Sequence, residues 1–493
     1  MKRLVCVSNR ISLPGNAAAS GGLAVGLLAA MGHTGGLWLG WSGETSPQPS
    51  DEPQVLTHDN IKFATLDLTA EQVENYYNGY CNGSLWPLLH YNPELLRHEQ
   101  RHYEAYQSVN ALFARQLLKL IEPGDAIWVH DYHLIPLARD LREQGFRGPI
   151  GFFLHTPFPH MQVLRLLPNH AELISDLCRY DVVGFQTEDD VRSFKSCFES
   201  GAAGVNRGGN GVVVEAPELR ARVAAYPIGI DVDGVVAEAK AAANEESVQR
   251  LRASLVGRKL IVGVDRLDYS KGLTERFAAF QEFLESFPEN QGNVTFLQIA
   301  PLSRSDVLAY SEIRAALEQS AGRINGTFAE ADWTPIRYLN RNFSHATTMG
   351  FLRAAQVALV TPVRDGMNLV AKEFVAAQDP EDPGVLIISP MAGAARELTS
   401  ALQVSPHDKR GMATALRDAL QMPLEERRER HRQMLEAIRR NDIHRWYGRF
   451  CADLDKVPSG GRELKISVSA RGEAARPGWW KRTVGRFFSS GAS

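Results

Sequence analysis

Short runs of apolar residues alternate with longer helical patterns along most of the chain. Several runs are apolar at every position rather than at every second one, which is typical of strands buried on both faces of a parallel sheet. Segments such as 104–120 and 273–287 lie between the runs and have helical periodicity. This order predicts an α/β fold with helices on both faces of each sheet. The predicted strands are Leu4–Val7, Ala126–Val129, Ile150–Leu154, Val182–Phe185, Leu260–Val264, Val294–Ile299, Val357–Val360 and Val385–Ile388.

The chain is too long for one ordinary core. It has 493 residues, whereas single hydrophobic cores stop growing near about 250–300 residues. A glycine-rich stretch followed by Pro227 and Gly229 marks a boundary, after which a new series of strands begins. We therefore predict a doubly wound domain over residues 1–230 and a second over 231–455. The composition changes near residue 459, and we expect a disordered basic tail over 456–493.

Composition narrows the class of protein. Lys and Arg number 54 against 57 Asp and Glu, for a formal net charge of -3, and nucleic-acid binders normally carry a basic excess. The sequence has no run of about 18 apolar residues, the length that a membrane-spanning helix needs. The five cysteines form no C-x-x-C pair, which favours a reducing cytoplasm over a disulfide framework or zinc site.

Polar and ionisable residues gather directly after the predicted strands. Ligands of open parallel sheets bind outside the carboxyl ends of the strands. If two such sheets face each other, their ligand-binding ends define a cleft between the domains. The segments that follow the strands are Asn9–Arg10, His130–His133, His155–Pro159, Asp265–Gly272, Ala300–Arg304 and Thr361–Glu373.

Arg266 and Lys271 follow one predicted strand. A leaving nucleoside diphosphate gains negative charge as a sugar bond breaks, and placed cations stabilise that charge more in the transition state than in the ground state. These two residues are therefore candidates to hold a diphosphate.

The segment Asp365–Glu373 is the second candidate for a nucleotide site. Gly366 allows the backbone to approach a ligand closely. A helix beginning near Asn368 would direct free N–H groups at a phosphate. Glu373 would lie one to two turns into that helix, where its carboxylate could accept hydrogen bonds from ribose hydroxyls.

Further residues, most of them in the N-terminal half, are candidates to bind a second, phosphorylated substrate. Arg10 and Arg304 could bind its phosphate, since a guanidinium matches phosphate oxygens in bidentate fashion. Tyr77 and Trp86 suit a sugar face, although such residues more often pack in a core. The pair Gly21–Gly22 could form a flexible loop on the acceptor side.

Two motifs point to other chemistry and are set aside. His130, His133 and His155 lack the spacing and the further ligands of a zinc set, so we expect no metal. The segment Asp231–Val235 resembles the aspartate-nucleophile motif of a phosphatase superfamily, but the later motifs of that superfamily do not follow in order.

Together the motifs resemble the trehalose-6-phosphate synthases, which are retaining transferases of glycosyltransferase family 20. The resemblance runs in order from about residue 4 to residue 455. The segments that carry it are Val7–Arg10, Gly36–Trp38, Gly40–Gly43, Trp128–Leu134, Gly151–His155, Pro157–Pro159, Asp265–Gly272 and Arg364–Glu373.

The resemblance implies a GT-B fold, in which two Rossmann-like domains face each other across a cleft. It also implies transfer of glucose from UDP-glucose to glucose 6-phosphate with retention, giving α,α-trehalose 6-phosphate and UDP. UDP-glucose is then a co-substrate, and neither a metal nor another cofactor takes part. Nucleic acid is not an expected partner, whereas a homo-oligomer is expected.

By the same resemblance, particular residues take particular roles. Residues His155 and Asp365 would contact the transferring glucose. Arg266 and Lys271 would act on the leaving group, and Trp86 would help to select the anomer. The acceptor would be bound by Arg10, Tyr77, Asp131 and Arg304. The donor would be bound by Gly22, Arg266, Lys271, Phe343, Leu369, Val370, Ala371, Lys372 and Glu373.

Three alternatives stay open at this stage. The acceptor could be another phosphorylated compound such as glycerol 3-phosphate. A non-catalytic sensor of sugar phosphates could share the fold, although the intact set of polar residues speaks against it. A phosphorylase is disfavoured because no site for a pyridoxal-phosphate lysine is evident. The nucleotide base is not determined by the sequence.

Deletion of residues 459–493 should leave the activity in solution intact, because the candidate site residues all precede residue 374. The segment Trp479–Phe488 combines aromatic residues with cations and could bind an anionic membrane surface. Co-sedimentation of full-length and truncated protein with liposomes tests this. Equal sedimentation would exclude a membrane role, and lost activity would place the tail within the fold.

Overall fold

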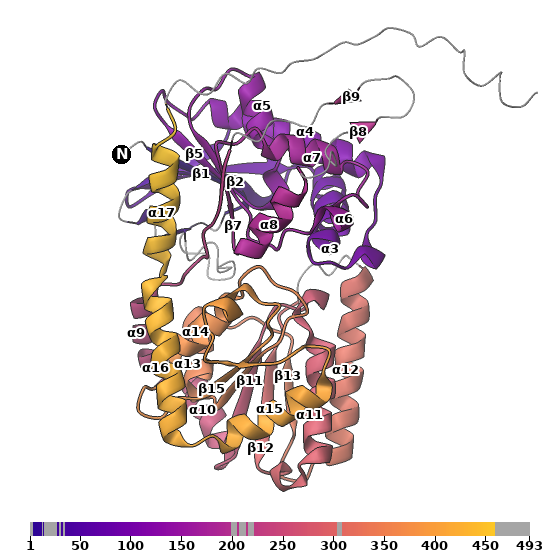
Figure 1. The fold of residues 1–493 in the computed structure, drawn as a ribbon, viewed down its shortest axis with the longest axis vertical. Helices are drawn as coiled ribbons and strands as arrows, with labels where there is room; N and C mark the ends of the chain where they lie inside the picture. The colour runs from indigo at the N-terminus through magenta and orange to yellow at the C-terminus, as the bar shows by residue number, and fades with distance from the viewer. Residues whose placement is uncertain are drawn as a thin grey trace, which may run out of the picture.

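Two predominantly parallel sheets form the centres of two lobes, one above the other in Figure 1. The structure is a computed structural model. It describes residues 3–11, 13, 27–28, 31–32, 35–198, 205–206, 213–214, 221–302 and 308–458. Helices cover both faces of each sheet. The predicted α/β class, with two sheet-centred lobes as a GT-B fold requires, is confirmed.

The sheet of the upper lobe has eight strands in the order β10-β7-β6-β5-β1-β2-β4-β3. Only β3 runs antiparallel to its neighbour. The strands are β1 Leu4–Arg10, β2 Gly36–Thr45, β3 Gln54–His58, β4 Ile61–Leu68, β5 Ala126–His130, β6 Ile150–Phe153, β7 Val182–Phe185 and β10 Arg222–Ala225. A separate pair consists of β8 Val205–Asn206 and β9 Val213–Val214. The helices are α2 Ala70–Gln72, α3 Trp86–Leu89, α4 Gln100–Leu118, α5 Leu137–Glu143, α6 Met161–Leu164, α7 His170–Leu177 and α8 Glu188–Ser196, with a π-helical segment over Val73–Leu85.

The sheet of the lower lobe has six strands, all parallel, in the order β13-β12-β11-β14-β15-β16. The strands are β11 Lys259–Val264, β12 Val294–Ile299, β13 Ile336–Leu339, β14 Val357–Val360, β15 Val385–Ile388 and β16 Leu402–Gln403. The helices are α9 Val232–Ala242, α10 Glu246–Leu255, α11 Leu273–Ser286, α12 Leu308–Phe328, α13 His345–Ala354, α14 Leu369–Ala377, α15 Lys409–Gln421, α16 Leu424–Arg440 and α17 Ile443–Asp455.

The continuously apolar runs are central strands, as predicted. Every residue of β5, β6, β7, β12, β14 and β15 is buried, because helices cover both faces of each sheet. The predicted helices 104–120 and 273–287 correspond to α4 and α11. The apolar pattern did not reveal β2, whose glycines interrupt its apolar run, or the antiparallel pair β3 and β4. It also did not reveal the short strands β8, β9, β10, β13 and β16.

The last helix ties the two lobes together. α17, yellow in Figure 1, leaves the lower lobe and runs along the upper one. The Phe450 ring stacks on Trp128 of β5, with ring centroids 4.3 Å apart. Gly151 and Gly184 make room for it, since an added Cβ would lie 2.6 Å and 2.9 Å from the Phe450 ring. The predicted domain boundary at residue 230 stays a prediction. α17 belongs to the predicted second domain by sequence, but it packs on the sheet of the first.

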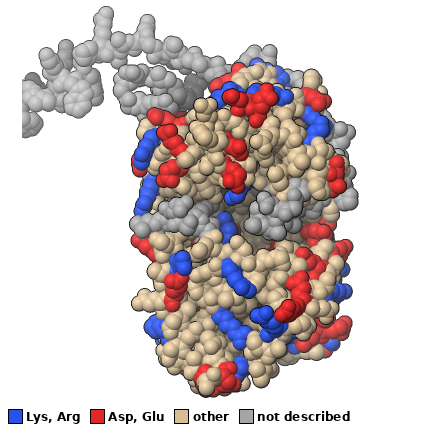
Figure 2. Space-filling model, turned by 180° about the vertical axis from the view of Figure 1, so that it is seen from behind, with Lys and Arg blue, Asp and Glu red and all other residues tan. Residues whose placement is uncertain are grey.

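The surface carries charges of both signs, and the cysteines lie in the interior. Basic and acidic side chains are interspersed on the face shown in Figure 2, and the waist between the lobes is hollowed. No helix among the described residues is long and apolar enough to cross a membrane. All five cysteines are buried and free. The predicted basic tail lies outside the described residues from position 459 onward.

Phe450→Ala should lower the free energy of unfolding by about 3–5 kcal/mol, because it leaves a cavity between α17 and the first sheet. Chemical denaturation followed by intrinsic fluorescence measures the loss. Arg445→Ala is the matched control, since Arg445 is an exposed residue of the same helix. Similar midpoints for the two variants would contradict the anchoring role of Phe450.

Candidate active site

Two neighbouring strands of the first sheet deliver Asp131 and His155 to one place. β5 ends at His130 and β6 ends at Phe153. The Asp131 backbone N–H donates to the Phe153 carbonyl at 2.8 Å. The His155 backbone N–H donates to Oδ1 of Asp131 at 3.2 Å. Asp131 adopts a positive φ of 75°, a conformation uncommon outside glycine that is often found where function requires it.

His155 is electrically neutral at physiological pH. Burial lowers the pKa of His155 to about 3. Burial also lowers the pKa of His130 well below its ordinary value, and the neighbouring His155 lowers it further. Nδ1 of His130 lies 3.2 Å from Nε2 of His155. Because both rings are neutral, one nitrogen of this contact donates and the other accepts. His155 can therefore hydrogen-bond a sugar hydroxyl but cannot supply a positive charge.

A buried arginine shapes the loop that carries Arg266 and Lys271. Arg276 of α11 is fully buried, and its Nη1 donates to Oδ2 of Asp265 at 2.6 Å. Its Nη2 donates to the backbone carbonyl of Lys271 at 3.2 Å. Gly272 completes the turn with a φ of +64°, and a Cβ there would lie 2.3 Å from the Thr361 carbonyl. The loop backbone is therefore held from both sides.

Lys271 and Asp365 form an ion pair. The Lys271 Nζ donates to Oδ2 of Asp365 at 2.5 Å, and the side chains are 12% and 14% exposed. Asn368 donates to the same oxygen at 3.1 Å. Burial raises the pKa of Asp365, but Lys271 and these hydrogen bonds outweigh burial and leave the pKa below its ordinary value. Asp365 is therefore a carboxylate, an acceptor for hydroxyl groups.

The loops of the two lobes touch each other. A Cβ at Gly366 would lie 2.0 Å from the His155 carbonyl oxygen, so the loop after β14 packs directly on the loop after β6. Nearby, the exposed Arg266 lies over the Trp86 ring of the first lobe, 5.6 Å from its centroid. Asp365 and Lys271 also influence the pKa of His90 in the first lobe, which burial lowers to about 4. The candidates from both domains therefore share one cleft.

The helix α14 begins at the cleft as predicted. Asn368 adopts a left-handed conformation with φ 72°, and its side chain accepts from the Ala371 N–H at 3.3 Å. Leu369 and Val370 are half-buried at the first turn. Free N–H groups at such a helix start suit a phosphate.

The side chains of Lys372 and Glu373 differ in their burial and in their partners. Lys372 is fully buried, and its Nζ donates to the Ile228 carbonyl at 2.8 Å and to Glu397 at 2.7 Å. The Lys372 side chain therefore joins the lobes internally, and only its backbone remains for the predicted donor site. Glu373 is 14% exposed, and its Oε1 lies 3.7 Å from Nε2 of His345.

The acceptor candidates that the structure describes, Arg10, Tyr77 and Asp131, lie on the first lobe. Tyr77 belongs to the π-helical segment, and segments of this kind occur often at functional sites. Its ring packs edge-on against Trp41 at 5.8 Å and stacks on His133 at 5.9 Å. Arg10 is exposed and lies over the same Trp41, 5.6 Å from its centroid. Arg10 and Tyr77 therefore share Trp41 as a support.

Three donor and acceptor candidates stand apart from these contacts. Phe343 packs edge-on against Phe351 of α13 at 5.2 Å, with Arg341 over its outer face. Gly22 and Arg304 lie outside the described residues. The assignments of all the candidate site residues stay predictions.

Sequence reasoning missed the residues that support the candidates. His130 was weighed only as a metal ligand, whereas it contacts His155. Arg276 and His345 were not singled out. A charged residue within the apolar pattern of α11 was the available signal for Arg276. Among the residues that the structure describes, no group of three or more His, Cys, Asp or Glu could hold a metal ion.

The comparisons with known proteins define the class. The sequence pattern of Glycosyltransferase family 20 matches residues 10–456. The chain belongs to glycosyltransferase family 20. The resemblance to the trehalose-6-phosphate synthases is thereby confirmed.

The relatives are similar over nearly their whole length. The chain is 49% identical over 466 residues to the trehalose-6-phosphate synthase of Salmonella arizonae, covering 94% of this chain and 98% of the relative. It is similar to an α,α-trehalose-phosphate synthase (UDP-forming) from Burkholderia xenovorans in complex with glucose-6-phosphate (TM-score 0.87, 48% identity, 92% and 100% of the two chains). It is also similar to an E. coli structure bound with UDP-2-fluoro glucose (TM-score 0.85, 44% identity, 92% and 99%).

His345→Gln should remove a pH-dependent part of the stability. Glu373, together with Glu238, raises the pKa of His345 to about 9, above its value of about 6.5 in an unfolded chain. The stabilisation is therefore complete below about pH 6.5 and is lost as the pH rises through about 9. Denaturation midpoints at about pH 6 and about pH 10 measure this loss. The variant should lose less than the parent protein.

His407→Gln is the control, because His407 is exposed. It should retain the pH dependence of the parent protein. Identical pH dependence in His345→Gln and the parent protein would contradict the pairing of His345 with the two glutamates.

Proposed function

We propose that this glycosyltransferase moves glucose from UDP-glucose to glucose 6-phosphate with retention, forming α,α-trehalose 6-phosphate and UDP. The observation that carries the proposal is the cleft, where Arg266 and the Lys271–Asp365 pair of one lobe meet His155 and Trp86 of the other. Relatives of similar length are UDP-forming synthases, one with glucose-6-phosphate bound.

Arg266 and Lys271 hold the diphosphate of the donor in this proposal. Charge develops on the leaving diphosphate as the glucosyl bond breaks, and prepositioned cations stabilise it without reorganisation. Lys271 is prepositioned because Asp365 pairs with its ammonium and Arg276 holds its backbone carbonyl. The N–H groups of Leu369 and Val370 face the same phosphates, and Glu373 accepts from ribose hydroxyls.

His155 and Asp365 contact the glucose that is transferred. His155 is neutral and Asp365 is ionised, so the first can donate or accept and the second accepts only. One sugar hydroxyl can thus donate to Asp365, while another donates to His155 or accepts from it. Trp86, which lies under Arg266, helps to select the anomer in this proposal.

The acceptor binds mainly to residues of the first lobe in this proposal. Asp131 and Tyr77 bind its hydroxyls, and Arg10 with Arg304 binds its phosphate, to which a guanidinium can donate two hydrogen bonds. Gly22 and Phe343 complete the donor side. The reaction needs no metal or other cofactor in this proposal. The free, buried cysteines support a reducing cytoplasmic location, and a homo-oligomer stays an expectation.

Arg266→Ala should lower turnover about 10²–10³-fold, a loss of ~2.7–4 kcal/mol of transition-state stabilisation. The KM for glucose 6-phosphate should change far less. Steady-state kinetics with UDP-glucose and glucose 6-phosphate measure both. Arg314→Ala is the control, since Arg314 pairs with Glu318 on the exposed side of α12.

Turnover of Arg266→Ala close to that of the parent protein would falsify the role of Arg266 in leaving-group departure. The same assay with ADP-glucose, GDP-glucose and glycerol 3-phosphate tests the substrates. Faster transfer with another pair than with UDP-glucose and glucose 6-phosphate would contradict the proposed reaction.

A further inference from the structure

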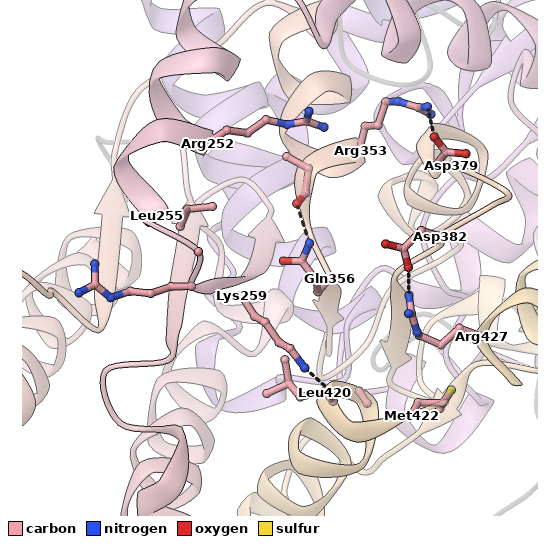
Figure 3. A pocket seen from close by; sticks show the side chains of 14 residues that line it. Arg252, Leu255, Lys259, Arg353, Gln356, Asp379, Asp382, Leu420, Met422 and Arg427 are labelled. Carbon is pink, nitrogen blue, oxygen red and sulfur yellow. Dashed lines mark hydrogen bonds and ion pairs between the residues drawn. The ribbon is translucent and has the colours of Figure 1, made fainter. Parts of the chain in front are cut away.

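A pocket apart from the cleft lies in the lower lobe (Figure 3). It adjoins the amino ends of β11 and β14, whose carboxyl ends lead to the catalytic loops. Its volume is about 650 Å³, within the range of about 300–1,000 Å³ of small-molecule sites. It is lined by Arg252, Leu255, Gly257, Arg258, Lys259, Arg353, Ala354, Gln356, Asp379, Asp382, Ala419, Leu420, Met422 and Arg427.

The charges of the lining are unequal. Five lining residues are basic and two are acidic. In two ion pairs of the lining, the arginine is largely buried in the pocket wall and its carboxylate partner is more exposed. Arg353 is 13% exposed and its partner Asp379 is 50% exposed, at 2.8 Å. Arg427 is 21% exposed and its partner Asp382 is 73% exposed, at 2.7 Å. Exposed carboxylates are weak, solvent-screened partners, so an anion inside the pocket can replace them.

Two further cations have no carboxylate partner among the described residues. Lys259 donates its Nζ to the neutral carbonyl of Leu420 at 2.5 Å. The Arg252 guanidinium has no hydrogen bond or ion pair within the part of the chain that the structure describes. Figure 3 shows the Arg252 side chain extending in the direction of Arg353. Arg252 and Lys259 thus add two positive charges to the lining without a carboxylate partner among the described residues.

Helix ends explain part of this arrangement. α10, α13 and α15 all end at the pocket, and helix C-termini attract cations with about half a negative charge each. Lys259 binds the Leu420 carbonyl at the end of α15, and Arg353 binds the Ala377 carbonyl at the end of α14. Arg252 binds no such carbonyl, so the helix ends do not account for its charge.

We propose that this pocket is a binding site for a phosphorylated small molecule. The phosphate oxygens accept from Arg252 and Lys259, and Arg353 and Arg427 turn from their exposed carboxylates to the same dianion. A phosphate alone would fill little of the volume. The remainder of the ligand lies against Leu255, Ala354 and Met422, which supply the apolar part of the wall.

The site is tested by calorimetric titration of the full-length protein with adenosine monophosphate and, separately, inorganic phosphate, in the presence of saturating UDP. UDP occupies the diphosphate site of the cleft, and comparison with Arg252→Ala separates the pocket from the acceptor site, to which Arg252 does not belong. Arg252→Ala should weaken binding of adenosine monophosphate about tenfold or more, because a charge-assisted contact is lost. Lys259→Met should weaken it similarly while it keeps the apolar stem of the side chain.

Arg250→Ala is the matched control, since Arg250 is on the same helix, 79% exposed, and does not line the pocket. It should bind like the parent protein. Equal isotherms for the parent protein and Arg252→Ala, or equal losses in Arg250→Ala and Arg252→Ala, would overturn the proposal. Inorganic phosphate should bind more weakly than the nucleotide. Equal affinity of the two would overturn the proposed contact of an organic part.

Discussion

The contact of Gly366 with the carbonyl of His155 is the constraint on which the cleft depends. A Cβ at Gly366 would lie 2.0 Å from that oxygen, and a Cβ at Gly393 would lie 2.0 Å from the Gly366 carbonyl. Three backbone segments are therefore stacked with no room for a side chain. Only glycine permits this approach. Because the loop after β14 rests on the loop after β6, the carboxylate of Asp365 and the imidazole of His155 belong to the same space.

Around this contact, charged groups are held in place before any substrate binds. Arg276 is buried without exposure, and its buried partner Asp265 satisfies it at 2.6 Å. Breaking such a pair is costly, because it leaves an unpaired buried charge. The loop that carries Arg266 and Lys271 is consequently rigid at its base. Electrostatic stabilisation of a leaving group requires dipoles and charges that do not reorganise, and the buried network meets that requirement.

Much of the fold and part of the site followed from local pattern. Strands buried on both faces are readable as unbroken apolar runs, and the residues after them lie at the carboxyl edge by topology. Ion pairs and hydrogen bonds between residues distant in sequence could not be predicted from local pattern. Nothing near Lys372 predicts that its ammonium joins Glu397 and Ile228. Likewise, nothing near His345 predicts its position between Glu238 and Glu373. Tertiary packing decides these pairings, and neighbouring positions on one helix can serve opposite roles.

The two edges of the lower sheet differ in the groups that can bind an anion. At the carboxyl edge, the start of α14 offers N–H groups and the positive end of a helix dipole, so anions are favoured by the backbone itself. At the amino edge, helix C-termini disfavour anions, and any affinity for a phosphate must come from side chains. Such a site needs more cations than the helix ends bind. Arg252 has no partner among the described residues and is that surplus cation. Arg353 and Arg427 add to the surplus because their carboxylate partners are exposed.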